Sequence, residues 1–71
     1  MHIVIADSLP ASAANSLRAA GYTVDARSGR KPEELALDLV NADALIVRSA
    51  TQVTASLIEG APNLRVVARA G

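Results

Sequence analysis

The sequence has no cysteine, tryptophan or phenylalanine, and Tyr22 is its only aromatic residue. The lack of cysteine excludes disulfides, thiolate chemistry and cysteine-based metal sites. The near absence of aromatic side chains argues against the base-stacking surfaces of modules that bind single-stranded nucleic acids. A metal site built from several histidines is also excluded, because His2 is the only histidine in the sequence.

Charge of one sign is also lacking, because seven Lys and Arg residues balance seven Asp and Glu residues. Neither sign forms a long run, so the pattern predicts no surface for nucleic acid or anionic lipid. The apolar run at the start is too short for a signal peptide or a membrane span, and no Arg-rich transit segment precedes it. We therefore expect a cytoplasmic protein with neither nucleic-acid nor membrane partners.

The chain is rich in aliphatic residues, and its 71 residues are 51% hydrophobic. A chain of this length forms at most one small domain and buries only about 60% of the surface that its unfolded form exposes. Four short strand-like runs alternate with three helical segments. The predicted strands are 2–6, 22–26, 44–47 and 64–68, and the predicted helices are 10–20, one that begins at Pro32, and a short one capped by Thr54.

The predicted helix ends rest on residues with known end preferences. Asp7 or Ser8 can cap the first helix, and Gly21 follows it at the position where a left-handed residue is usual. Pro32 suits the first turn of the second helix. The buried stripe of that helix is expected to comprise Leu35, Ala36, Leu39 and Val40, with Leu37 outside it.

Strands that alternate with helices predict a parallel sheet with right-handed crossovers. The first and third strands are apolar throughout and belong inside the sheet, whereas the second alternates with polar residues and belongs on an edge. The order 2-1-3-4 meets both demands, with the first helix on one face and the other two on the opposite face. We therefore predict a three-layer βαβαβαβ fold, the amino-terminal half of a flavodoxin-like domain.

Ligands of such sheets bind beyond the carboxyl ends of the strands, where the winding reverses. Arg48 and Arg69 follow the third and fourth strands, and two guanidinium groups there would suit a carboxylate or phosphate. The alternative is that each is a solvated charge or a partner for an acid such as Asp7.

Other polar groups suggest further hypotheses. Arg27, Arg30 and Lys31 share a polar loop and are expected to be solvated. Asp25 ends a strand like the ribose-binding acid of dinucleotide folds, but the turn after the first strand has no glycine for a pyrophosphate. Ser8, Ser49 and Thr51 have no histidine base nearby, so nucleophilic catalysis is unsupported.

Two segments, 47–54 (VRSATQVT) and 57–71 (LIEGAPNLRVVARAG), resemble the D-isomer-specific 2-hydroxyacid dehydrogenases. Residues 4–10 and 32–35 agree with the likeness. Within the family, the resemblance is strongest to the members that act on 3-phosphoglycerate. The most specific part is the pairing of Arg-Ser-Ala-Thr with a terminal Arg-Ala-Gly.

The resemblance implies the start of a substrate-binding domain that closes over an NAD-binding domain. It implies that Arg48 and Arg69 face the acidic substrate, and we predict substrate contacts for Arg48, Ser49, Thr51, Arg69 and Gly71. The family's dinucleotide loop, catalytic arginine, glutamate and general-acid histidine would lie further along than residue 71. We therefore expect this chain alone to bind no cofactor and to have no catalytic residue.

Two interpretations of other classes stay open. One is a stand-alone flavodoxin-like binding module such as a receiver domain, although the third strand ends in Arg48 where a receiver carries a phosphorylatable aspartate. The other is a structural or designed fragment made for studies of folding and association.

Self-association follows from the predicted topology. One helix is too narrow to cover four strands, so the third and fourth strands should expose Leu45 or Ile46, and Val66 or Val67. We expect a symmetric homodimer through the fourth strands or the open sheet faces. The alternative is a loosely packed monomer with a tilted first helix.

Overall fold

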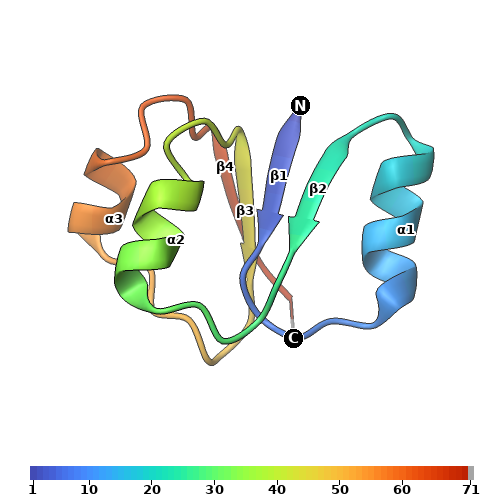
Figure 1. The fold of residues 1–71 in the computed structure, drawn as a ribbon, viewed down its shortest axis with the longest axis horizontal. Helices are drawn as coiled ribbons and strands as arrows, with labels where there is room; N and C mark the ends of the chain where they lie inside the picture. Colours follow the sequence, from blue (N-terminus) through green and yellow to red (C-terminus); the bar gives the residue numbers. More distant parts are fainter. Residues whose placement is uncertain (71) are drawn as a thin grey trace.

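The computed structural model describes residues 1–70, in which strands and helices alternate from one end to the other (Figure 1). The strands are β1 (His2–Ile5), β2 (Thr23–Ala26), β3 (Ala44–Val47) and β4 (Val66–Arg69), and the helices are α1 (Ala11–Ala19), α2 (Pro32–Asp38) and α3 (Ala55–Glu59). All neighbouring strands pair in parallel, in the order β2-β1-β3-β4. The predicted topology and strand order are confirmed.

The two central strands carry the core, because their side chains are buried on both faces. Val4 and Leu45, which are partners in register, pack with Leu35 and Leu39 on the face that α2 and α3 cover. On the other face, the cluster around Ile3, Ile5, Ala14 and Ala44 packs under α1. Figure 1 shows α1 alone on its side of the sheet, with α2 and α3 together on the opposite side, as predicted.

The start of α1 differs from the prediction. Pro10 is its N-cap residue, and no side chain makes a capping hydrogen bond there. Asp7 and Ser8 lie too early in the chain for this role, and the Asp7 carboxylate is occupied by the loop after β3. The expected end at Gly21 is confirmed, since this residue has a φ of 96°, in the region where glycine is favoured.

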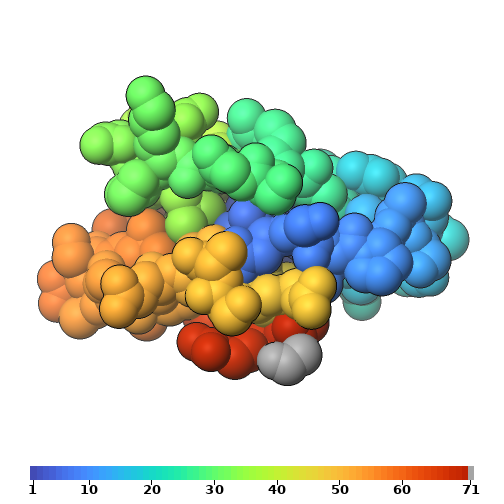
Figure 2. Space-filling model, turned by 90° about the horizontal axis from the view of Figure 1, so that it is seen from below, coloured from blue at the N-terminus to red at the C-terminus, as the bar shows by residue number. Residues whose placement is uncertain are grey.

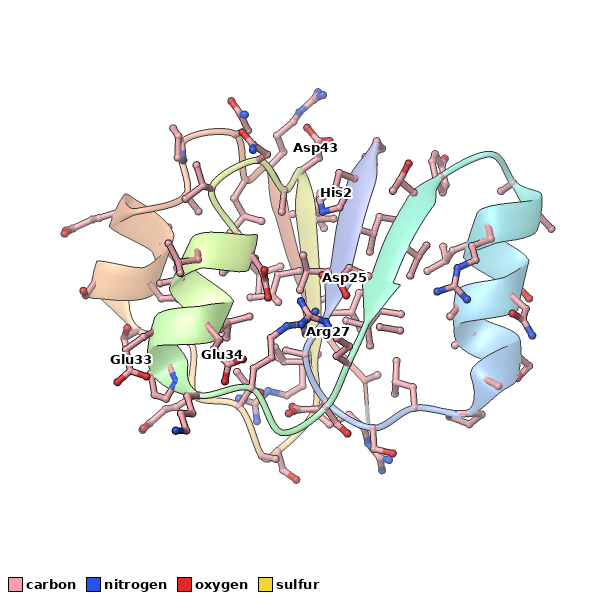
Figure 3. The ribbon with its side chains drawn as sticks, viewed as in Figure 1. His2, Asp25, Arg27, Glu33, Glu34 and Asp43 are labelled. Carbon is pink, nitrogen blue, oxygen red and sulfur yellow. The ribbon has the colours of Figure 1, made fainter. Side chains whose placement is uncertain are left out.

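The other two helices begin as the sequence predicts. Pro32 is the first residue of α2, and the Lys31 N–H donates to the Glu34 carboxylate at 3.1 Å. Figure 3 shows Glu34 and Glu33 at this end of the helix, where carboxylates favour the positive end of the dipole. In α3, the Thr54 hydroxyl accepts from the Leu57 N–H at 3.1 Å. No helix within residues 1–70 is long and apolar enough to cross a membrane.

The predicted buried stripe of α2 is only half correct. Leu35 and Leu39 are buried, and Leu37 points outward with 74% of its surface exposed. Ala36 and Val40 are exposed, contrary to the prediction. The helix ends at Asp38 with Leu39 as its C-cap, so Leu35 and Leu39, four positions apart, face the sheet, and Val40 lies beyond the helix.

The polar loop after β2 is also different from the prediction, because the Arg30 side chain is only 3% exposed. Its Nε donates to Asp38 at 2.8 Å, and its Nη1 donates to the carbonyl oxygens of Ile5 at 3.0 Å and Arg27 at 2.7 Å. Its Nη2 lies 2.9 Å from an Asp25 carboxylate oxygen. Arg30 thus adds a second donor to the last carbonyl of β1, which also accepts from the Arg27 backbone N–H at 3.2 Å, and it joins β2 to α2, since a buried charge must be paired.

Arg27 joins the same network from the solvent side, where Figure 3 shows it beside Asp25 between β2 and α2. It donates to Asp25 at 2.9 Å and to Asp38 at 2.7 Å. The hydrogen bonds from Arg27 lower the pKa of Asp25, and the charge of Arg30 adds to the effect against a smaller opposing contribution from burial. Asp25 is therefore held in a structural ion-pair network.

All four residues of the outer strand β4 are exposed, which shows that the helices cover this strand poorly. Val66 is 49% exposed and aligns with Ala44 on the α1 face, whereas Val67 is 43% exposed and aligns with Leu45 on the opposite face. Leu45 itself is fully buried, and Ile46 is only partly covered. β4 is the last strand of the sheet, and no strand within residues 1–70 pairs with its outer edge. The two exposed valines thus lie on opposite faces of an unpaired edge strand.

We expect the chain to self-associate through this edge, since an exposed apolar strand with free backbone groups pairs readily with a second copy. Val66→Lys should weaken the dimer about tenfold or more, because it places two like charges at the contact. Sedimentation equilibrium at micromolar concentration measures this. Leu37→Lys, on the exposed side of α2, is the matched control and should leave the dimer unchanged. A wild-type monomer whose melting temperature is independent of concentration contradicts the prediction.

Candidate functional site

Three segments meet at the carboxyl edge of the sheet. Figure 2 views this edge directly: the loop after β3, in yellow, lies between the loop after β1, in blue, and the end of β4, in red. The loops converge because parallel strands all present their carboxyl ends to the same side. The winding of the chain reverses between β1 and β3, so this is also the point at which ligands bind in folds of this kind.

Asp7 is the central polar residue of this edge, and it is only 7% exposed. Its Oδ2 accepts hydrogen bonds from the backbone N–H groups of Arg48 at 2.6 Å and Thr51 at 3.1 Å. Its Oδ1 accepts a short hydrogen bond from the Thr51 hydroxyl. One carboxylate therefore holds both ends of the 48–51 loop against the end of β1.

These hydrogen bonds determine the charge state of Asp7. Burial alone raises the pKa of the carboxyl group, but the Thr51 hydroxyl and the two backbone N–H groups together stabilise the anion more strongly. The nearby Arg48 guanidinium acts in the same direction. The pKa of Asp7 is lowered as a result, and the residue is an anion at neutral pH.

Arg48 and Arg69 emerge from neighbouring strands, but they are offset by one position. Arg69 aligns with Val47, the residue before Arg48, and both of these strand residues face the side of α2 and α3. Arg48 instead reaches the loop after β1, where its Nη1 donates to the Ser8 carbonyl at 3.3 Å. Both arginines are exposed, so their guanidinium groups are accessible to an anion in solvent.

The remaining predicted contact residues differ in what they can offer. Ser49 is exposed in the loop after β3. Thr51 is partly buried, and its hydroxyl proton is directed at Asp7. Gly71 lies outside the described residues.

Two clefts lie near the carboxyl edge, and one of them is lined by residues of the 48–51 loop. One, of about 370 Å³, lies on the side of α2 and α3 and is lined in part by Thr51, Gln52 and Thr54. The other, of about 290 Å³, lies between α1 and the end of β2 and includes Asp7 and Ser8. Neither Arg48 nor Arg69 lines these two clefts, so an anion held by the arginines would sit on an open surface.

The only histidine lies at the other end of the sheet. His2 starts β1, where its N–H donates to the Asp43 carboxylate at 2.7 Å, and Figure 3 shows the two residues together. The Asp43 N–H in turn donates to the His2 carbonyl at 2.8 Å. His2 is thus placed at the amino edge, away from Ser8, Ser49 and Thr51, and cannot serve as their base.

The sequence alone does not identify the role of Asp7, for which it suggests a helix cap or a partner for an arginine side chain. The partners of Asp7 are the Thr51 hydroxyl and two backbone N–H groups, all more than 40 residues away. The sequence does contain a signal for this role. An aspartate that directly follows one buried strand, next to a second buried strand, must find hydrogen-bond donors in the loop that follows the second strand.

We predict that Asp7→Asn lowers the free energy of unfolding at pH 6–7 by about 2 kcal/mol, because it removes charge-assisted hydrogen bonds to two backbone groups and a hydroxyl. The pKa of Asp7 is lower in the folded chain than its ordinary value of 3.8, so its contribution is present above that pH and is lost on further acidification. The difference between the two proteins should therefore shrink below pH 4.

Urea titrations from pH 3 to pH 7 measure this difference. Glu59→Gln, at an exposed acid on α3, serves as the control and should change the free energy of unfolding little at any pH. A difference between wild type and Asp7→Asn that stays constant from pH 7 to pH 3 contradicts a role for the charge.

Comparison with known proteins places the chain in a family. The family model described as D-isomer specific 2-hydroxyacid dehydrogenase, catalytic domain, matches residues 3–71. D-3-phosphoglycerate dehydrogenase of Archaeoglobus fulgidus is 34% identical over 100% of the chain and 14% of its own length. The Rattus norvegicus enzyme of the same name is 44% identical over 97% of the chain and 13% of its own length.

A solved structure shows the same fold. The crystal structure of the TT0316 protein from Thermus thermophilus matches with a TM-score of 0.82 and 26% identity, over 94% of this chain and 22% of that one. The chain spans about a seventh of the length of the curated relatives it matches. The fold, the matched segments and the relatives agree, and the chain belongs to the D-isomer specific 2-hydroxyacid dehydrogenase family.

Proposed function

We propose that this chain forms part of the substrate-binding domain of a cytoplasmic, NAD-dependent D-3-phosphoglycerate dehydrogenase that serves serine biosynthesis. Two relatives that are named for that activity match 97% or more of this chain, which supports 3-phosphoglycerate as the substrate. The observation that carries the proposal is the arrangement of the carboxyl edge, where Arg48 and Arg69 leave adjacent strands around a loop held by Asp7.

The chemistry of the edge suits such a substrate. 3-Phosphoglycerate carries a carboxylate and a phosphate, and a guanidinium group offers a planar fork of donors to either. Arg48 and Arg69 supply two such forks from adjacent strand ends. Within residues 1–70 neither guanidinium group forms a salt bridge, because the four salt bridges there all belong to Arg27 and Arg30.

We propose that the chain by itself binds no NAD and transfers no hydride. Its four glycines, Gly21, Gly29, Gly60 and Gly71, do not form the Gly-x-Gly-x-x-Gly spacing that lets a pyrophosphate approach a helix start. Its one histidine is at the amino edge of the sheet. In this proposal, the residues that hold the cofactor and move the proton belong to other parts of the enzyme.

The anion site is tested by titrating the ¹⁵N-labelled chain with 3-phosphoglycerate. We expect amide shifts in residues 48–54 and 69–70 with millimolar affinity, about 4 kcal/mol, because the site is open to solvent. The double variant Arg48→Ala with Arg69→Ala should abolish the shifts. Arg65→Ala, an exposed arginine at the amino end of β4, should keep them.

Absence of shifts in the wild type, or their survival in the double variant, contradicts the proposed site. The same samples, mixed with NAD and 3-phosphoglycerate, should show no growth of NADH absorbance above the protein-free control. Turnover by the purified chain contradicts the proposed division of labour.

A further inference from the structure

The 48–51 loop is anchored by a buried polar side chain. Asp7 and its donors are separated by 41 to 44 residues, and all the hydrogen bonds converge on the two oxygens of one carboxylate. Arg48 is therefore held through its backbone, while its guanidinium group makes one longer contact, 3.3 Å to the Ser8 carbonyl. Ser8 directly follows Asp7 in the chain. The Arg48 backbone and the Arg48 guanidinium group therefore both bind to the 7–8 segment, the first to Asp7 and the second to Ser8.

We propose that Asp7 is the positioning residue of the anion site, and that its carboxylate, through Thr51, holds the 48–51 loop in the conformation that presents Arg48 to the substrate. This inference rests on the proposed function, because it concerns the same site. Asp7 itself does not touch the anion: it is buried beneath the loop, with both oxygens occupied.

The physical basis is preorganisation. An exposed arginine with one weak contact samples many rotamers, and a loop without its anchor adds backbone freedom. A site that is assembled for only a fraction of the time has its apparent affinity reduced by that fraction. The carboxylate is suited to this role because it accepts from several N–H and O–H groups at once, whereas an asparagine would turn an N–H₂ group toward one of these donors.

An electrostatic role for Asp7 leads to the opposite expectation. A carboxylate near an anion site repels the ligand, so removing only its charge should tighten anion binding. Positioning predicts that the same substitution weakens binding. The sign of the change in affinity therefore separates the two roles.

The test uses inorganic phosphate as the probe and Thr51→Val with Thr51→Ser as a matched pair. Valine keeps the shape of threonine but loses the hydroxyl that donates to Asp7, and serine restores it. We expect Asp7→Asn and Thr51→Val to weaken phosphate binding about fivefold to tenfold, and Thr51→Ser to restore it to near the wild-type value.

Amide hydrogen exchange supplies a readout that does not depend on the ligand. The amides of Arg48 and Thr51 should be protected in the wild type and in Thr51→Ser, and should exchange at least about tenfold faster in Asp7→Asn and Thr51→Val. Faster exchange of the Arg48 amide in Thr51→Val is decisive, because residue 48 and Asp7 are untouched and only the Thr51 hydroxyl that donates to Asp7 is lost. If Asp7→Asn does not fold, the threonine pair carries the test.

Unchanged or tighter phosphate binding in both Asp7→Asn and Thr51→Val, with the wild type binding as expected, overturns the positioning role and leaves the proposed function intact. No phosphate binding by the wild type, despite protected Arg48 and Thr51 amides, overturns the proposed site instead. Weakened binding with faster exchange, reversed by serine, supports the positioning role.

Discussion

The carboxyl edge of this sheet depends on one buried carboxylate. Asp7 follows the buried strand β1, and its anion is stable there because two backbone N–H groups and a hydroxyl replace the water that burial removes. The donors come from the loop after β3, so the requirement to satisfy Asp7 also determines where that loop lies. Asp43 makes an equivalent link between β1 and β3 at the amino edge. The two central strands are thus joined at both ends by aspartates that accept backbone hydrogen bonds.

The requirement that a buried charge be paired also separates the arginines that stabilise the fold from those that can bind a ligand. The Arg30 side chain is buried and donates to the last carbonyl of β1, and Arg27 closes the network with Asp25 and Asp38. Arg48 and Arg69, in contrast, are exposed at the edge where folds of this kind bind ligands. A loop held by Asp7 between them connects the architecture to the proposed chemistry: the core determines the backbone of the site, and the exposed side chains supply its charge.

The topology could be predicted well from the sequence, because it follows from hydrophobic patterns. The continuous aliphatic runs around Val4 and Leu45 identify the central strands, and the polar alternation of β2 identifies an edge. Prediction failed where distant parts of the chain meet. Nothing local distinguishes the buried Arg30 from the exposed Arg27, and the partners of Asp7 become neighbours only when β1 and β3 pair. Val40 is exposed because it lies beyond the short α2, and periodicity alone does not reveal where that helix ends.

Titration of the Asp7 side-chain carboxyl carbon, followed by NMR as a function of pH, tests the central role of this residue most directly. If the hydrogen bonds from Thr51 and Arg48 hold Asp7 as described, its pKa lies below the ordinary value of 3.8, and the amide resonances of Arg48 and Thr51 shift with the same midpoint. A midpoint at or above 3.8, with amides that do not follow it, would contradict the account, since the carboxylate would then be buried without the donors assigned to it.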